Sequence, residues 1–270
     1  MAERPGPSAM SGLLRRTPLI GMVHLPPLPG SPRSELSLDE VIEVALEEAA
    51  ILEGAGLDGL IVENVGDTPF FRESVPTQTV AAMGVIVREV RRQTSLAVGV
   101  NLLRNACLEA MSIASLVRAD FIRCNVVIGA YVTDQGLIQG CAAELARLRQ
   151  TLDQDIAVLG DVHVKHAAPL FDVPIEDAAA DLAERGGADA VIVSGARSPD
   201  PPSMDRVKAV RDVVDAPVLV GSGVSLANVA DFYEASDGVL IGETDFKVDR
   251  IWGGRSDGAA YAEAVRRCRG

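Results

Sequence analysis

Three ionisable residues alternate along one short apolar segment, which reads GDVHVKH over residues 160–166. Alternate side chains of an extended strand point to the same face, so Asp161, His163 and Lys165 would share a face opposite the valines. Three ionisable groups on one face of a buried strand are costly unless they are paired or used in chemistry. The segment therefore predicts a polar site, in which Lys165 could act as a base or as a Schiff-base nucleophile.

Eight apolar segments of strand length recur along the chain, and each precedes a segment with helical periodicity. The strand-like segments span residues 18–25, 57–64, 96–102, 119–126, 156–165, 188–195, 217–223 and 238–243. Helices are expected over residues 37–53, 76–93, 105–117, 141–152, 175–185, 203–214, 226–234 and 257–268. The alternation predicts a parallel sheet, and eight units in 270 residues favour an α/β fold of one domain, the (β/α)8 TIM barrel, over an open doubly wound sheet.

Connections between these segments are short before each strand and long after it. This asymmetry is typical of a barrel whose functional face lies at the C-terminal ends of its strands. We expect the glycine-bounded residues 129–136 to form either a lid over this mouth or an ordinary surface loop. Residues 1–16 are rich in Pro, Gly, Ser and Arg, so we expect a disordered tail before a barrel over residues 17–270.

Inward-facing strand positions line the lumen of a barrel, and alternation predicts which positions these are. A purely structural barrel fills them with Val, Ile and Leu, whereas polar residues recur here near the strand ends. Besides the three residues of the fifth strand, the predicted inward positions are Met22, His24, Ile61, Glu63, Gly99, Asn101, Arg123, Asn125, Ser194, Gly221, Gly223, Ile241 and Glu243. This ring predicts a catalytic or ligand-binding site at the mouth.

Roles within the ring follow from residue type. Glu63 and His163, with Asp161 and Lys165, could move protons on a carbon next to a carbonyl group, and we predict that these four residues are catalytic. The residues predicted to orient a substrate are His24, Asn101, Arg123, Asn125 and Ser194. The alternative for the fifth strand is an internal ion pair between Asp161 and Arg123 that serves only the fold.

Glycines end the seventh and eighth strands, where many phosphosugar TIM barrels bind phosphate through backbone N–H groups. Gly221, Gly223 and Gly242 are therefore predicted to bind phosphate. Glu243 follows directly and would repel a phosphate unless it points away, in which case the glycines could also serve only tight turns.

Metal binding requires several His, Asp or Glu side chains that converge on one point. The residue types are present in His24, Glu63, Asp161 and His163, but no recognised metal spacing occurs. We expect no cofactor, and a divalent metal in a metal-dependent hydrolase is kept as an alternative.

The composition restricts partners and compartment. The net charge of −13 argues against nucleic acid and anionic lipid as partners, and no apolar run reaches the ~18 residues of a membrane span. Because no CxxC spacing occurs, we interpret the cysteines as free thiols of a reducing cytosol; they are Cys107, Cys124, Cys141 and Cys268. We expect a cytoplasmic homo-oligomer whose partner is a small phosphorylated metabolite.

Four segments carry a family resemblance: GMVHLPPLPGSP over residues 21–32, Glu63-Asn64, AYVTDQG over 130–136 and DVHVKH over 161–166. Together they resemble the BtpA/SgcQ family, from about residue 18 to 250. The resemblance implies a TIM barrel. Members are linked to photosystem I biogenesis as membrane-associated factors, whereas others accompany sugar-metabolism genes or carry a phosphoribosylanthranilate-isomerase-like label. That isomerase has a cysteine base at the end of strand one, where this chain has His24, and no catalytic residue is carried over from the family.

We infer an enzyme that acts on a small phosphorylated sugar or related metabolite. It would work by proton abstraction, as isomerases and epimerases do, or by carbon–carbon cleavage, as aldolases do. The rival interpretation is a non-catalytic assembly factor for a membrane protein complex. The rival predicts a large exposed apolar patch and tolerance of Lys165→Ala, whereas the enzyme requires a deep polar pocket.

Overall fold

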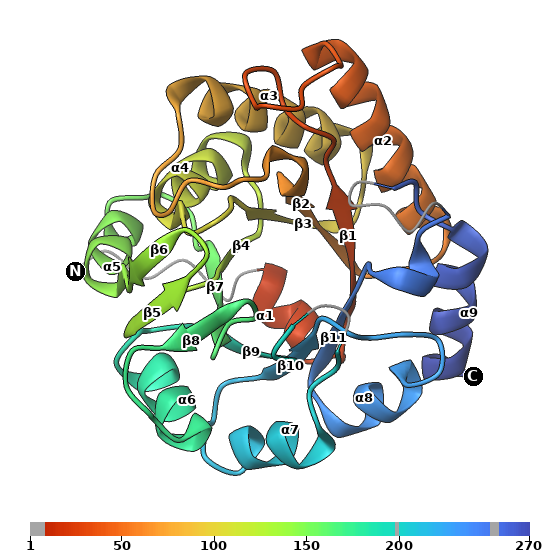
Figure 1. The fold of residues 1–270 in the computed structure, drawn as a ribbon. Coiled ribbons are helices and arrows are strands. Elements are labelled where there is room, and N and C mark those ends of the chain that lie inside the picture. Colours follow the sequence, from red (N-terminus) through yellow and green to blue (C-terminus); the bar gives the residue numbers. More distant parts are fainter. Residues whose placement is uncertain (1–8, 198–199, 249–253) are drawn as a thin grey trace.

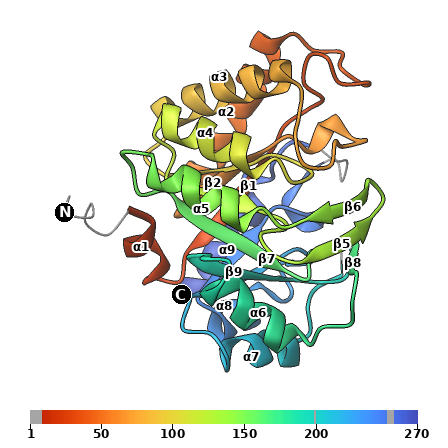
Figure 2. The ribbon, with the colours of Figure 1, turned by 90° about the vertical axis from the view of Figure 1, so that its left-hand side faces the viewer.

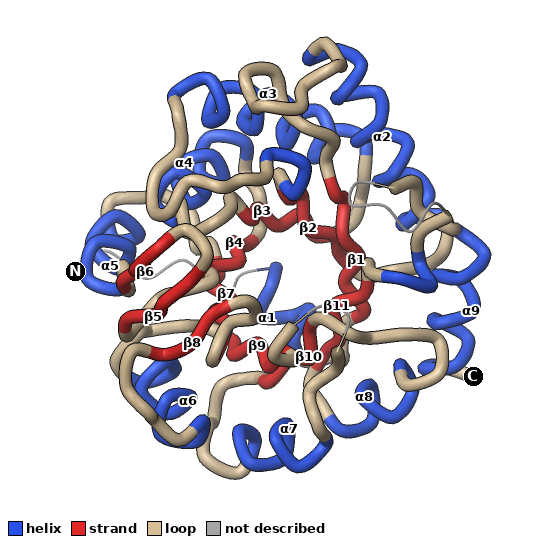
Figure 3. Tube along the Cα trace, in the orientation of Figure 1, coloured by secondary structure: helices blue, strands red, loops and turns tan. Residues whose placement is uncertain are grey.

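Eight parallel strands close into a barrel that is surrounded by helices (Figures 1 and 3). The structure is a computed structural model that describes residues 9–197, 200–248 and 254–270. The barrel strands are β1 (Leu19–His24), β2 (Gly59–Glu63), β3 (Ala97–Asn101), β4 (Phe121–Cys124), β7 (Ala157–Val162), β9 (Ala190–Ser194), β10 (Val218–Gly221) and β11 (Gly238–Ile241). Because β1 pairs in parallel with both β2 and β11, the barrel is closed. The predicted TIM barrel is confirmed, and the open-sheet alternative is wrong.

Helices cover the outside of the barrel at the positions that the periodicity predicts. They are α2 (Leu38–Gly54), α3 (Thr77–Gln93), α4 (Cys107–Val117), α5 (Ala142–Gln150), α6 (Ile175–Glu184), α7 (Met204–Arg211), α8 (Val229–Ala235) and α9 (Gly258–Arg269), with short 3-10 turns at Val65–Asp67 and Thr244–Phe246. Helix α2 begins with a capping box, in which Ser37 accepts the N–H of Glu40 and the Glu40 carboxylate accepts the N–H of Ser37. The apolar faces of the helices pack on the outward side chains of the strands in one continuous core.

The lumen divides into an apolar lower half and a polar upper half. The lower half is a separate cluster of inward side chains that includes Ile20, Phe121, Leu159 and Leu219. Phe121 fits because Gly99 beside it on β3 has no side chain, and a Cβ there would overlap the ring. Polar residues replace these apolar residues only in the last inward layer, so the fold concentrates them at the C-terminal ends of the strands.

The N-terminal segment closes the other end of the barrel. Residues 9–14 form helix α1 (Ala9–Leu14), and Leu14 is buried in the lower lumen cluster with Ile20. Figure 2 shows α1 at the end of the barrel opposite β5, β6 and β8. The expected disordered tail over residues 1–16 is therefore wrong for its described part; residues 1–8 lie outside the described residues.

A small antiparallel sheet lies at the mouth. It has the order β6 (Gly136–Gln139), β5 (Ala130–Thr133), β8 (Ala167–Pro169). The predicted lid or surface loop over residues 129–136 thus forms β5 and its tight turn into β6, and β8 links it to the segment that follows β7. None of the described helices is long and apolar enough to cross a membrane.

Two cysteines form a disulfide behind the barrel wall. Cys107 at the start of α4 is bonded to Cys124 on β4, and the Cys141 sulfur lies 3.7 Å from that of Cys124. The interpretation of all four cysteines as free thiols is therefore wrong for this pair, whereas Cys141 and Cys268 are free. Sequence spacing could not reveal the pair, because its partners are brought together only by packing of α4 on β4.

Candidate functional site

Strand register places a row of polar side chains across the mouth. In adjacent parallel strands His24 lies opposite Glu63, Glu63 opposite Asn101, and Asn101 opposite Arg123. All four residues are buried, and all four were predicted from alternation to face the lumen. Because the register is fixed by backbone hydrogen bonds along whole strands, the order of these groups is rigid.

The Asp161 carboxylate is saturated by hydrogen bonds. It accepts bonds from Arg123 Nε at 2.9 Å and Nη2 at 2.8 Å, from Asn125 Nδ2 at 3.0 Å and from the Ser194 hydroxyl at 3.3 Å. Burial acts to lower the pKa of Arg123, but the attraction of Asp161 and the bonds to it raise this pKa above its usual value. The pair is the internal ion pair that the sequence left open as an alternative, and it leaves Asp161 little capacity to accept a substrate proton.

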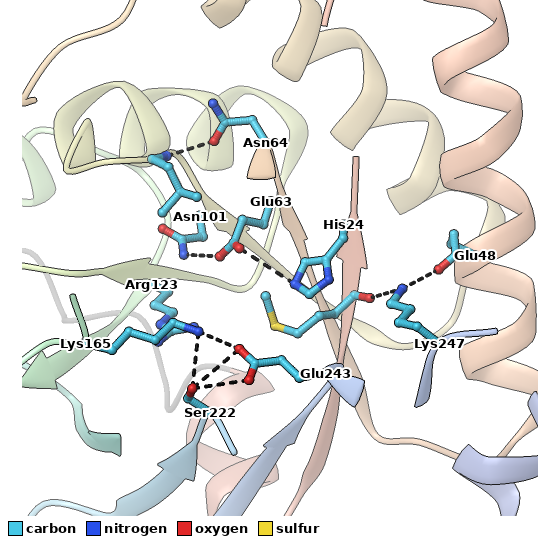
Figure 4. A network of polar contacts seen from close by, with 12 residues as sticks. His24, Glu48, Glu63, Asn64, Asn101, Arg123, Lys165, Ser222, Glu243 and Lys247 are labelled. Atoms are coloured by element: carbon cyan, nitrogen blue, oxygen red, sulfur yellow. Dashed lines mark hydrogen bonds and ion pairs between the residues drawn. The ribbon is translucent and has the colours of Figure 1, made fainter. Parts of the chain in front are cut away.

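Glu63 and His24 form the part of the row that can transfer protons (Figure 4). One Glu63 oxygen accepts a 2.5 Å bond from Asn101 Nδ2, and the other lies 3.7 Å from His24 Nε2. Burial raises the pKa of Glu63, although Arg123 and Lys165 oppose this rise. A carboxylate whose pKa is raised is a stronger base than an exposed one and is therefore a better proton acceptor.

His24 is electrically neutral at physiological pH. Burial, together with the positive charges of Lys247 and Lys165, lowers its pKa to about 3. Lys247 lies outside the lumen, where it pairs with Glu48 of α2 at 2.8 Å (Figure 4). The contact between His24 and Glu63 is therefore a contact of a neutral imidazole with a carboxyl group.

Lys165 enters the mouth from a loop, not from a strand. Strand β7 ends at Val162, and the chain then turns through His163 and His166, whose φ values are +48° and +57°. This turn carries the Lys165 ammonium to 2.5 Å from Glu243 and 3.3 Å from the Ser222 hydroxyl. Figure 4 shows this group across from Glu63. Lys165 therefore lies at the mouth as predicted, but it is placed there by a turn after β7 and not by alternation along the strand.

His163 lies outside the mouth. Since the strand has ended, His163 does not share a face with Asp161, and this part of the prediction is wrong. It lines a cavity of about 360 Å³ between the small sheet and α6, where its ring meets that of Tyr131 edge-on at 6.4 Å.

The predicted inward position on β11 is also wrong by one residue. Ile241, which was predicted to face the lumen, belongs to the outer core, and its neighbour Leu240 belongs to the lumen cluster.

Glu243 occupies the turn that was predicted to bind phosphate. Its carboxylate accepts bonds from the Gly223 N–H and the Ser222 hydroxyl, both at 3.3 Å. It therefore does not point away, and a phosphate at this turn would have to displace it. Packing also accounts for the glycines, because a Cβ would overlap Met22 at Gly242 and the Pro201 backbone at Gly223, whose φ is +70°.

The mouth holds a partly open cavity of about 70 Å³. Its polar lining consists of His24, Glu63, Arg104, Arg123, Asn125, Lys165, His166, Ser222 and Glu243. Phe70 and Leu103 separate it from a neighbouring cavity of about 390 Å³.

Three polar lining residues were missed by sequence reasoning: Arg104, His166 and Ser222. All three lie in the loops after strands, where strict alternation no longer holds. The sequence does contain a signal for Arg104, which is a single charged residue between the apolar Leu102-Leu103 pair and Asn105.

The side chains that the sequence suggested as metal ligands do not meet at one point. His163 lines another cavity, and the Asp161 carboxylate is bound by Arg123.

Comparison with known proteins yields one family and one recurrent fold. The model of the BtpA family matches residues 15–257. An uncharacterized protein of Pyrococcus horikoshii is 49% identical over 225 residues, which are 83% of this chain and 86% of that protein. Photosystem I biogenesis protein BtpA of Synechocystis is 44% identical over 225 residues, which cover 83% and 78% of the two chains.

Among solved structures, (S)-3-O-geranylgeranylglyceryl phosphate synthase from Thermoplasma acidophilum, in complex with its substrate sn-glycerol-1-phosphate, superposes with a TM-score of 0.59. The match covers 97% of this chain and 99% of the synthase. At 16% sequence identity this likeness establishes a shared fold. Both chains place the C-terminal ends of their strands at one face, where TIM-barrel enzymes hold their active sites.

Proposed function

This chain belongs to the BtpA family, and from that premise and the geometry of its mouth we propose that it is an enzyme acting on a small phosphorylated sugar or a related metabolite. Proton abstraction next to a carbonyl group, the chemistry of isomerases and epimerases, is the reaction type that the residues favour. The glycerol phosphate bound by the fold neighbour supports a phosphorylated substrate class. The expected cytoplasmic location and homo-oligomeric state belong to the same proposal.

One observation carries the proposal: Glu63 and Lys165 line the same cavity from opposite sides. Glu63 has a raised pKa because it is buried, so its carboxylate is a stronger base than an exposed one. Lys165, paired with Glu243, presents an ammonium group that can stabilise negative charge on a carbonyl oxygen. Glu63 would remove the proton from the adjacent carbon and return it to the other position or face.

Carbon–carbon cleavage places a different demand on the same residues. Lys165 would have to lose its proton, for which the Glu243 carboxylate 2.5 Å away is an acceptor, and attack the carbonyl as a neutral amine. In the structure the Lys165 Nζ is held 2.5 Å from the Glu243 carboxylate and is not directed as a nucleophile, and for this reason proton abstraction is preferred.

A ligand screen followed by kinetics tests the proposal. Thermal-shift measurements against phosphosugars, with and without divalent metals, should identify a compound that raises Tm. With that compound, Glu63→Gln and Lys165→Met should each lower kcat by about 10²–10⁴-fold. Lys208→Met on the exposed face of α7 is the matched control and should retain full activity. The proposal is wrong if no phosphorylated compound changes Tm.

Borohydride trapping separates the two reaction types. The chain contains only three lysines, Lys165, Lys208 and Lys247, so mass spectrometry assigns a reduced Schiff base without ambiguity. Proton abstraction predicts no adduct, together with exchange of deuterium from solvent into the substrate. An adduct on Lys165 would establish the aldolase mechanism instead.

A second candidate function is the assembly role for which the Synechocystis relative is named. Leu170, Phe171 and Val173, between β8 and α6, expose apolar side chains, and Phe171 is 75% exposed. An assembly factor predicts that Phe171→Ser abolishes its function while Lys165→Met does not. The enzyme predicts the reverse.

A further inference from the structure

Arg104 places a buried positive charge in the wall of the mouth cavity. The residue is only 7% exposed and lies in the loop between β3 and α4. One guanidinium nitrogen donates a 2.5 Å bond to the backbone oxygen of Lys165. Within residues 9–197, 200–248 and 254–270, no carboxylate forms an ion pair with it, although the guanidinium has five N–H donors.

Among the residues that the structure describes, Arg104 lacks the carboxylate partner that Arg123 has. Both arginines are buried and line the same cavity, but Arg123 is matched by two bonds to Asp161. Burial lowers the pKa of Arg104, as expected where the charge is poorly compensated. A buried charge without a counter-ion is unfavourable unless a ligand supplies one.

The loop that carries Arg104 is held in place on both sides. The Leu103 N–H donates to Asn64 Oδ1 at 2.8 Å, and the Arg104 N–H donates to the Phe71 oxygen at 3.0 Å (Figure 4 shows the Asn64 bond). Asn105 pairs with both backbone groups of Val126, at 2.8 and 3.0 Å. A fixed backbone positions the guanidinium before a ligand arrives, which lowers the entropic cost of binding.

We propose that Arg104 binds the phosphate group of the substrate, an inference that rests on the proposed function and assigns its anion subsite. A guanidinium donates two parallel bonds to phosphate oxygens, which suits a ligand of this geometry. The other two cations at the cavity, Lys165 and Arg123, already face Glu243 and Asp161. The phosphate is therefore held on the β3 side of the mouth and not at the glycine turn, where Glu243 takes the Gly223 N–H.

Isothermal titration with inorganic phosphate and with sn-glycerol-1-phosphate, at constant ionic strength in chloride, tests this assignment. Arg104→Gln should raise the dissociation constant by about 10- to 100-fold, the loss expected for a hydrogen-bonded charge. Ser222→Ala, which alters the glycine turn, should leave it within about twofold. Arg104→Lys keeps the positive charge but cannot donate two parallel hydrogen bonds to phosphate, so it should recover only part of the affinity.

The ligand-free Tm distinguishes binding from a structural role. Removal of an uncompensated charge should leave this Tm unchanged or raise it. A lower Tm with unchanged phosphate affinity would mean that Arg104 only braces the Lys165 backbone, and the assignment would be overturned.

The remaining outcomes separate the two proposals. If the wild-type protein binds phosphate and only Ser222→Ala weakens binding, the anion lies at the glycine turn; this overturns the Arg104 site and leaves the proposed function intact. If no phosphorylated compound binds the wild-type protein, the proposed function fails and the subsite fails with it.

Discussion

The mouth of this barrel consists of a strand-built part and a loop-built part, and they differ in how completely their polar groups are satisfied. In the strand-built part, Asp161 accepts four hydrogen bonds and holds Arg123 in a buried ion pair. In the loop-built part, the Lys165–Glu243 pair is partly exposed, at 15% and 19%, and Arg104 has no carboxylate partner among the described residues. The saturated groups of the strand-built part fix its geometry, whereas Arg104 has further N–H donors with which it can bind a ligand.

The largest expected effect comes from breaking the strand-built pair. Asp161→Ala leaves Arg123 buried without its counter-ion and should lower the free energy of unfolding by about 3–5 kcal/mol. Urea denaturation measures the change. In the loop-built pair, Glu243→Gln should cost no more than about 1 kcal/mol, because solvent reaches both partners. An equal loss of unfolding free energy in the two variants would mean that the strand-built and loop-built pairs do not differ in their contribution to stability.

An intermediate effect is expected from His24, whose contribution depends on pH. Its pKa is about 3 in the folded protein and 6.5 without burial, so between these values the unfolded chain binds more protons than the folded one. Stability should therefore rise as pH increases from 3 to 6.5 and then level off. His24→Gln should flatten this rise, as measured by urea denaturation at a series of pH values. An unchanged slope in the variant would mean that the imidazole is not buried in its neutral form.

The smallest effect is expected from the loop-built histidine. Burial also lowers the pKa of His166, but this side chain is largely exposed, so His166→Gln should change the acid slope much less than His24→Gln does. The same series of denaturation curves provides the measurement. A larger change for His166 than for His24 would reverse the proposed order of the two regions.

The same division explains what could be predicted from the sequence. Alternation within strands identifies Glu63, Asn101 and Arg123 correctly, because side chains of a strand alternate strictly and register aligns neighbouring strands. It fails at His163, where a left-handed backbone conformation ends the strand, and at Arg104, which no strand carries. Loop conformation depends on contacts between segments far apart in the chain, such as that of Arg104 with Phe71, and these contacts have no local signature.

Helix α1 gives the molecule one closed end, and both described ends of the chain lie there (Figure 2). An affinity tag or a surface tether attached to either end would leave the open end facing solution. Attachment to a larger assembly through the closed end would leave the mouth accessible to small molecules in the same way. Attachment through the closed end and turnover of a metabolite at the mouth are thus compatible in one protein, whereas docking through the apolar segment after β8 would take place on the mouth side.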